Sequence, residues 1–574
     1  MPPRRPPPRA PLALLLPLLS LLTPSASTFA AAPTRPSFVF ILSESLDGRL
    51  LRPGSLARAP NIRALLAGGS VRFDSAYANS PVCAPSRSSL HSGRAPHKIA
   101  HEHNGMLVRG VWNNAEGLPA NYSSRLDQLL NASGYATLLS GKTDWNVGGH
   151  SLANDLECYT FNVRWPYNIT AGTGWNQEPG DDMCPSDGPV SPGGSAGPEG
   201  SLYRPDWTIM DAAATFAATA PQPLFAFAGP SILHPSYRTN AYWFNIASNE
   251  TEAPFWPPLE SLHPCDLQAA MKRGCTPGAN NETARAAFYD PERVRRVRRV
   301  YLAELEEFDA MVGAVVAALD AAGRWRDGST TIVLAADHGD MQLEHQMFYK
   351  MVPYDASSRV PLIFASPALA PLGAKTVAQP AQLLDIFPTL LTLAGLPVPE
   401  YADGFDLSPY FAPGVERDEA RPPFVVVQNA DTDQSMAWFA VVNGSHKLVQ
   451  YGTGAQVPPQ LFDLESDPGE LVNLHNSSDA ARAAEAALDA ALRSAIDYPS
   501  VAQDIANYEL AQFRFWANAT KDGRQVLASA SLRWQGAFTA HYNLSMAAVD
   551  AFLAQPEGGD AEIVPCDGRL AANL

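Results

Sequence analysis

The chain has 574 residues and a net charge of -17 at pH 7, with 46% hydrophobic and 17% charged residues. This negative charge excludes a protein that binds nucleic acid or other polyanions nonspecifically, because such binding needs a basic surface. Its 6 cysteines are too few for a disulfide scaffold, so a large hydrophobic core must stabilise the fold.

The N-terminus has the three-part pattern of a secretory signal peptide. Residues 1–9 are basic and proline-rich, residues 10–22 are apolar, and small residues follow, which predicts a signal peptide and short leader over 1–32. The apolar run is too short to span a bilayer, and no later stretch approaches the roughly 20 apolar residues that a membrane helix needs. We therefore expect a protein of the secretory pathway, lysosomal or secreted, with no membrane span.

Glycosylation sequons and paired cysteines fit the same route. The N-x-Ser/Thr sequons predict a glycoprotein and lie at Asn121, Asn131, Asn168, Asn249, Asn281, Asn443, Asn476, Asn518 and Asn543. Cys265 with Cys275, and Cys158 with Cys184, are plausible disulfide pairs, but sequence alone leaves the connectivity open.

Four short β-rich runs each lead to residues capable of chemistry. The runs 37–42, 135–140, 223–229 and 330–336 precede Glu44, Lys142, His234 and the pair Asp337-His338, respectively. Helical patterns separate the runs, which predicts an α/β fold with a large, mostly parallel sheet flanked by helices. Because the carboxyl ends of parallel strands meet at one edge, we expect these side chains to lie close together.

The remaining pattern divides the mature chain into two parts. Apolar residues from Val294 to Leu319 recur at three-to-four spacing and predict a long amphipathic helix that ends near Gly323. After about residue 410, three runs with β propensity precede an acidic, alanine-rich helix near 479–496. We predict a catalytic domain over 33–405 and a smaller C-terminal α+β domain with an antiparallel sheet over 406–574.

Residues 83–94, CAPSRSSLHSGR, place a lone cysteine in a polar setting. The segment fits C-x-P-S-R-x-x-x-x-x-G-R, and a second signature, GYATLLSGKTD, follows at 134–144. On these motifs the chain resembles the sulfatase family. The resemblance implies that the formylglycine-generating enzyme oxidises Cys83 to formylglycine before folding. One hydroxyl of the hydrated aldehyde would attack sulfur and the other would later expel sulfate, dividing a difficult displacement into two steps.

The same resemblance implies the residues that act on a sulfated saccharide substrate. The catalytic set is Cys83, Arg87, Lys142, His150, His234 and Lys350. Arg87 and Lys142 would support the formylglycine hydrate. Lys142, His234 and Lys350 would contact substrate, with His234 or Lys350 protonating the leaving oxygen. Many sulfatases have a histidine where this chain has Asp144, and we expect His150 to supply that imidazole.

The metal implied by the family is one calcium ion, which prefers oxygen ligands. The implied ligands are Glu44, Cys83, Asp337 and His338. Two departures stand out, because the family usually has Asp-Asp at Glu44-Ser45 and often Asn at His338. Since glutamate is one methylene longer than aspartate, Asp47 is an alternative first-strand ligand.

Further segments place the resemblance within one branch of the family, among them SLDGR at 45–49 and LEHQMFYKM at 343–351. This branch implies removal of the 2-sulfate of a uronic acid, glucuronate, from a glycosaminoglycan. A uronate carries a carboxylate beside its sulfate, so the pocket needs an additional cation or hydrogen-bond donor. Lys98, His101 and His103 are candidates for that contact, although a plain exposed loop explains them equally well.

Two other functions fit the same residues. A phosphomonoester or phosphonate hydrolase of the alkaline-phosphatase superfamily would share the sheet, but a two-zinc phosphatase needs more Asp and His at the strand ends. An inactive glycan-binding homologue is suggested by Glu44-Ser45. The tract His101-Glu102-His103 lacks the spacing of a zinc protease and is no argument for zinc.

Overall fold

The computed structural model describes most of the chain after the predicted leader. The described residues are 35–103, 106–112, 114, 116–119, 121–145, 185–255, 262–272, 289–430, 437–521, 554 and 559–561. The predicted signal peptide and leader, 1–32, lies outside them. None of the helices in these ranges is both long and apolar enough to cross a bilayer.

A seven-stranded sheet with the order β10-β2-β9-β8-β1-β7-β6 forms the centre of the larger part of the fold. Its strands are β1 (Ser37–Ser43), β2 (Ser70–Phe73), β6 (Ala136–Gly141), β7 (Leu224–Gly229), β8 (Thr330–Ala336), β9 (Leu362–Ala365) and β10 (Ala374–Val377). β6, β7, β1 and β8 are parallel neighbours, whereas β9 pairs antiparallel with both β8 and β2. The predicted mostly parallel sheet is therefore confirmed.

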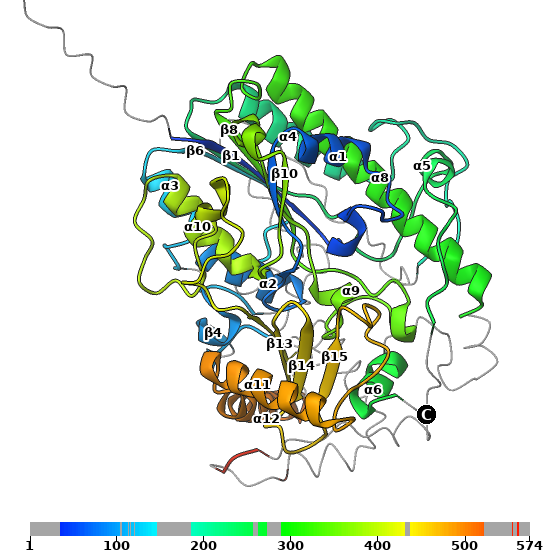
Figure 1. Cartoon of the computed structure of the whole chain (residues 1–574), viewed down its shortest axis with the longest axis vertical. Helices are drawn as coiled ribbons and strands as arrows, with labels where there is room; N and C mark the ends of the chain where they lie inside the picture. Colours follow the sequence, from blue (N-terminus) through cyan, green and yellow to red (C-terminus); the bar gives the residue numbers. More distant parts are fainter. Residues whose placement is uncertain are drawn as a thin grey trace, which may run out of the picture. The chain divides into compact units, whose positions relative to one another are not determined.

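Helices cover both faces of this sheet (Figure 1). One layer contains α1 (Pro60–Ala67), α4 (Arg204–Thr219), α5 (Ala241–Ile246) and α8 (Pro291–Ala321), and the other contains α2 (Cys83–Ser92), α3 (Leu126–Ala132) and α10 (Ile386–Leu393). The predicted long amphipathic helix is confirmed as α8, whose last residue, Ala321, lies close to the predicted end near Gly323. It begins where the Asp290 side chain accepts hydrogen bonds from the amides of Glu292 and Arg293, and its apolar stripe is buried.

Shorter elements connect these layers. The helices are η1 (Gly48–Leu51), η2 (Pro96–Lys98), α6 (Pro264–Lys272), η4 (Glu344–Gln346), α9 (Asp355–Ser358), η5 (Pro367–Leu372), η6 (Leu383–Asp385) and η7 (Ser408–Phe411). Two small sheets pair β3 (Ala76–Tyr77) with β11 (Ala381–Gln382), and β4 (Ala100–His103) with β5 (Met106–Arg109).

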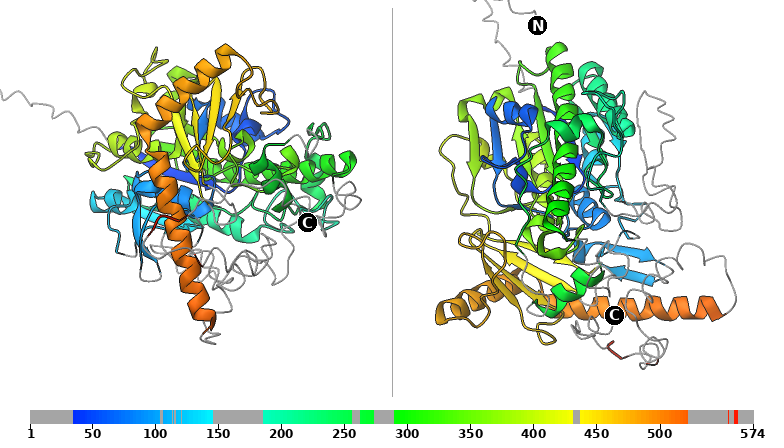
Figure 2. Two further views of the ribbon diagram at one scale, coloured as in Figure 1. Left: turned by 90° about the horizontal axis from the view of Figure 1, so that it is seen from below. Right: turned by 90° about the vertical axis from the view of Figure 1, so that its right-hand side faces the viewer.

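The predicted antiparallel C-terminal sheet is also confirmed. It contains β12 (Val425–Asn429), β13 (Trp438–Val442), β14 (His446–Tyr451) and β15 (Gln460–Asp463). Side chains alternate along β13: Trp438 and Ala440 join a core with Tyr77 and Met347 of the larger part, whereas Phe439 packs with the helices α11 (Asp479–Ala495) and α12 (Tyr498–Lys521). Figure 2 shows α12 as a long helix beside this sheet. The domain boundary at residue 405 stays a prediction.

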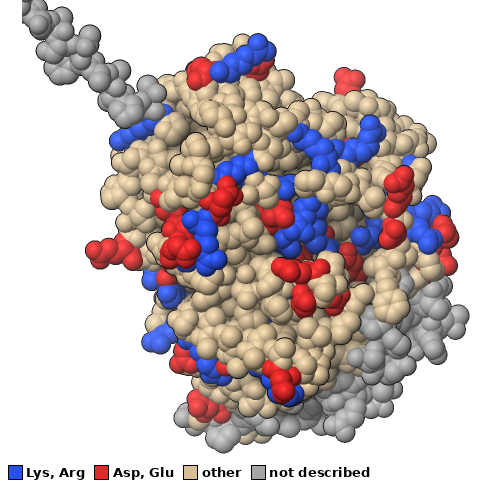
Figure 3. Space-filling view, in the orientation of Figure 1, with Lys and Arg blue, Asp and Glu red and all other residues tan. Residues whose placement is uncertain are grey.

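Charges of both signs are interspersed over the face in Figure 3. Surface residues of opposite sign also form ion pairs, such as Arg326 with Asp320 and Arg417 with Glu419. The described surface on this face therefore carries no extended basic patch of the kind that binds polyanions nonspecifically.

A buried ion cluster joins the C-terminal sheet to the larger part. Lys447 Nζ in β14 lies 2.6 Å from Asp355 Oδ1, 2.6 Å from Glu470 Oε1 and 2.9 Å from the Pro353 carbonyl oxygen. Burial disfavours the ionised form of Asp355, but Lys447 and Arg359 outweigh it and lower the pKa of this carboxyl. The lysine is thus the charge that allows two acidic groups to be buried together.

Lys447→Met is expected to destabilise the protein by about 3–5 kcal/mol, because it removes one partner of a buried ion cluster and leaves two carboxyl groups facing each other. The free energy of unfolding from urea titration measures this effect. Lys98→Met is the control, since the half-exposed pair Lys98–Asp403 should contribute about 1 kcal/mol or less. Equal losses in the two variants would contradict the assigned role of Lys447.

Candidate active site

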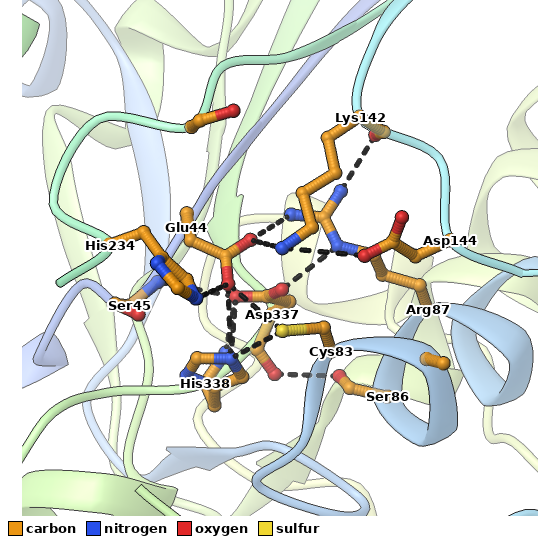
Figure 4. A network of polar contacts seen from close by, with 12 residues as sticks. Glu44, Ser45, Cys83, Ser86, Arg87, Lys142, Asp144, His234, Asp337 and His338 are labelled. Carbon is orange, nitrogen blue, oxygen red and sulfur yellow. Dashed lines mark hydrogen bonds and ion pairs between the residues drawn. The ribbon is translucent and has the colours of Figure 1, made fainter. Parts of the chain in front are cut away.

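The carboxyl ends of four adjacent parallel strands carry the predicted site residues (Figure 4). Glu44 follows β1, Lys142 follows β6, and Asp337 with His338 follows β8. His234 lies in the segment after β7. The strand order explains why residues far apart in the sequence meet at this edge.

Cys83 is the first residue of α2 and is completely buried. Its Sγ lies 3.0 Å from Glu44 Oε1, 2.7 Å from Lys350 Nζ and 3.5 Å from His338 Nε2. Burial and the neighbouring Glu44 carboxylate raise the pKa of the Cys83 thiol to about 12. The unmodified thiol is therefore protonated at neutral pH and would be a weak nucleophile.

Arg87 lies one helical turn beyond Cys83 and connects three strand ends. Its guanidinium donates to Asp337 Oδ2, to Glu44 Oε2 and to the Lys142 carbonyl oxygen, each at 2.8 Å. All four side chains are fully buried. The position of α2 relative to the sheet edge, and thus of Cys83, depends on this arginine.

The Glu44 carboxylate is ionised despite its burial. Its Oε2 lies 2.8 Å from both Lys142 Nζ and Arg87 Nη2. Burial raises the pKa of Glu44, but Lys142, Lys350 and Arg87 together outweigh burial and hold this pKa well below its ordinary value. A permanent negative charge therefore lies beside Cys83.

Four residues offer ligand atoms that all lie within 4.8 Å of one another, and these are Glu44, Cys83, Asp337 and His338. His338 Nδ1 donates to the Gly339 carbonyl oxygen at 2.8 Å, so in the neutral ring the lone pair of Nε2 faces this group. Two carboxylates and an imidazole lone pair fit a divalent cation. The Asp47 carboxylate lies outside the group and binds Arg49 at 2.8 Å.

His234 and Lys350 approach the same group from two loops. Lys350 Nζ lies 2.9 Å from His338 Nε2, and His234 Nε2 lies 3.9 Å from Glu44 Oε1. His234 Nδ1 donates to the Pro235 carbonyl oxygen at 2.6 Å, so Nε2 accepts from the Tyr349 hydroxyl at 2.8 Å. Burial and the Lys350 charge lower the pKa of His234, which keeps the ring neutral.

Sequence reasoning missed Tyr349. The residue is 115 positions from His234, so no spacing marks the contact, and its position next to Lys350 is the only local signal. Its ring also lies under the Lys350 ammonium, 4.2 Å from Nζ to the ring centroid.

Other predicted residues lie elsewhere. Lys98 is half-exposed in η2 and pairs with Asp403, His101 is buried in β4, and the side chain of His103 lies outside the described residues, as does His150.

The exposed sequon asparagines are Asn121, Asn131, Asn249, Asn443 and Asn476; Asn168, Asn281 and Asn543 and the side chain of Asn518 lie outside the described residues. Cys265 is disulfide-bonded, and the structure does not describe Cys158, Cys184, Cys275 or Cys566.

Comparison with known families decides the assignment. The sequence model of the sulfatase family matches residues 36–396, which include every residue of the site described above. The chain belongs to the sulfatase family. A second family, the C-terminal region of N-sulphoglucosamine sulphohydrolase, matches residues 343–496. This membership makes the protein a sulfuric ester hydrolase.

Relatives and solved structures agree with this family. Arylsulfatase K from Bos taurus is 30% identical over 88% of this sulfatase and 89% of its own length, and arylsulfatase K from Danio rerio is 31% identical over 87% and 91%. A 2-O GAG sulfatase, BT1596, matches with a TM-score of 0.56 and 23% identity, covering 82% of this chain and 93% of its own. The phosphonate monoester hydrolase of Agrobacterium radiobacter has the same fold, with a TM-score of 0.60, 20% identity and coverage of 80% and 95%.

Proposed function

We propose that this sulfatase uses a formylglycine formed from Cys83, together with one calcium ion, to remove the 2-sulfate of a uronic acid, glucuronate, from a glycosaminoglycan. The observation that carries this proposal is the position of Cys83 Sγ, which is within 3.5 Å of Glu44, His338 and Lys350. In the modified enzyme the formylglycine oxygens would stand close to the place of this sulfur.

The charged side chains have separate tasks in this proposal. Arg87 and Lys142 orient the nucleophile through the Glu44 and Asp337 carboxylates and also lower the cost of negative charge nearby. The Lys350 ammonium group, whose Nζ lies 2.7 Å from Cys83 Sγ, is the proton donor to the leaving oxygen. The neutral His234, whose Nε2 accepts from Tyr349, positions the sulfate beside it.

The calcium ion would be held by Glu44, Asp337 and His338 and by the nucleophile, and its charge would make a formylglycine hydroxyl more acidic. The three protein ligands include only two carboxylates, so further oxygen ligands must come from substrate or water. Maturation by the formylglycine-generating enzyme places the protein in the secretory pathway, with the lysosome or the extracellular space as its destination.

The proposed substrate rests on the relatives named arylsulfatase K and on the fold shared with a 2-O GAG sulfatase. A uronate needs a donor for its carboxylate in addition to those that hold sulfate. Of the rim candidates, Lys98 is half-exposed and can exchange Asp403 for the carboxylate of a ligand, whereas His101 is buried.

We expect the purified enzyme to hydrolyse a disaccharide with 2-sulfated glucuronate at least about 10-fold faster than one with 6-sulfated glucosamine, because a polar pocket rejects a substrate that leaves its donors unpaired. Desulfation of these two compounds and of 2-sulfated iduronate at lysosomal pH gives the measurement. Equal rates on all three, or a preference for the hexosamine, would reject the uronate assignment. Faster hydrolysis of a phosphate or phosphonate than of a sulfate of the same phenol would favour a phosphoester hydrolase.

A further inference from the structure

The segment 341–351, which carries Lys350, has an unusual backbone. Residues other than glycine adopt left-handed conformations at Gln342 (φ 47°), Leu343 (φ 71°), His345 (φ 53°), Gln346 (φ 55°), Tyr349 (φ 81°) and Met351 (φ 76°). Each such residue costs free energy, and a segment of this kind persists only where its surroundings hold it. The contacts that hold it therefore decide where the Lys350 ammonium lies.

Part of this support comes from the larger part of the fold. Asp340 Oδ1 accepts from the amides of Gln342 at 3.0 Å and Tyr349 at 3.3 Å. The Tyr289 hydroxyl donates to the Gln346 carbonyl oxygen at 2.6 Å. These contacts hold the segment before Lys350.

The residue after Lys350 is held by the C-terminal sheet instead. The Met351 carbonyl oxygen accepts from Asn429 Nδ2 at 3.2 Å and from Trp438 Nε1 at 3.1 Å. Asn429 is the last residue of β12 and Trp438 the first of β13; the two are paired in register and buried. Two donors from a rigid strand pair thus bind one carbonyl directly beside Lys350.

The same strand end also contacts the segment that leads to Cys83. The Gln428 amide donates to the Asn79 carbonyl oxygen at 3.0 Å, four residues before Cys83 in the chain. One end of β12 therefore binds both the approach to the nucleophile and the segment that follows Lys350. These two segments must keep a fixed separation if Lys350 Nζ is to stay 2.7 Å from the Cys83 position.

We propose that Asn429 and Trp438 are positioning residues for Lys350, and that the C-terminal sheet completes the active site through the Met351 carbonyl. Without their donors the left-handed segment relaxes and the ammonium withdraws from the nucleophile. The catalytic consequence rests on the proposed function of Lys350, whereas the effect on the backbone does not.

The test uses Trp438→Phe, which keeps an aromatic ring, and Asn429→Leu, which keeps a side chain of similar shape, and each variant removes one donor to the Met351 carbonyl oxygen. Asn429→Leu also removes an acceptor of the Ser80 hydroxyl. We expect each to lower kcat about 10-fold, since a small misplacement of a catalytic group has a large kinetic effect. In a Lys350→Ala background the same changes should have almost no further effect on kcat, because the group they position is absent. Hydrogen exchange of peptides over 341–351 should become faster in both variants.

Trp207→Phe is the matched control. Trp207 lies on α4, and its indole N–H donates to Glu307 Oε1 of α8 at 3.0 Å, so the variant loses an equivalent hydrogen bond away from this segment. Control kcat and exchange over 341–351 should match wild type. Unchanged exchange in Trp438→Phe and Asn429→Leu, or the same fold-loss of kcat with and without Lys350, would overturn the proposal. If wild type hydrolysed no sulfate ester, the proposed function would fail while the exchange result still decided whether the sheet holds this segment.

Discussion

Cys83→Ala is expected to abolish sulfate ester hydrolysis, with kcat reduced on the order of 10⁴-fold or more. The reason is that Cys83 Sγ lies within 3.5 Å of Glu44, His338 and Lys350, and none of these three neighbours is itself a nucleophile that can form the bond to sulfur. Lys142, His234 and Lys350 would still contact a sulfate group, but binding alone does not divide the displacement into two easier steps.

Two measurements make this prediction decisive. Hydrolysis of a nitrophenyl sulfate compares Cys83→Ala with wild type and with Ser92→Ala at the far end of α2. This control removes the hydroxyl that donates to the Ser88 and Ser89 carbonyl oxygens and accepts from the Arg94 amide, and it should leave activity near wild type. The mass of the wild-type tryptic peptide 73–87 should show a carbonyl oxygen in place of the thiol and one hydrogen of Cys83. An unmodified thiol in active enzyme would disprove the formylglycine mechanism.

Glu44→Gln is expected to lower activity more than about 100-fold. This loss is larger than the one expected for a residue that only hydrogen-bonds to a metal ligand. The substitution replaces a charged oxygen ligand by a neutral amide and leaves Arg87 and Lys142 without the carboxylate that both contact at 2.8 Å. Metal content after gel filtration should fall together with activity, because calcium prefers charged oxygen ligands.

Asp47→Asn is the matched comparison for Glu44→Gln. Asp47 lies in the same loop, but its carboxylate binds Arg49 outside the ligand group, so its loss should reduce activity much less and leave metal content intact. Glu44→Asp, which restores the usual residue of the family, should retain metal. The reverse order, with Asp47→Asn losing the metal and Glu44→Gln keeping it, would make Asp47 the ligand.

The sequence by itself determined the elements whose signals are local. Short β-rich runs located β1 and β8, and a helical three-to-four spacing located the long helix α8 to within a few residues, because apolar side chains mark the parts of the chain that face the core. Because the carboxyl ends of parallel strands share one edge of a sheet, the sequence also predicted that Glu44, Lys142 and Asp337 lie close together. The motif over 83–94 identified Cys83 as the residue at the centre of the active site.

Only the tertiary structure decided that β9 lies between β8 and β2 and runs antiparallel to both. The residues of a four-residue strand do not indicate which strands will be its neighbours or in which direction it will run. The tertiary structure also placed the Glu44 carboxylate beside Cys83 and the Asp47 carboxylate against Arg49, although the two residues are three positions apart and chemically alike. The support of Met351 by Asn429 and Trp438 connects residues 78 and 87 positions apart. Such contacts depend on how the two sheets pack against each other. The apolar pattern of each sheet shows which of its side chains are buried, but not which residues of the other sheet they contact.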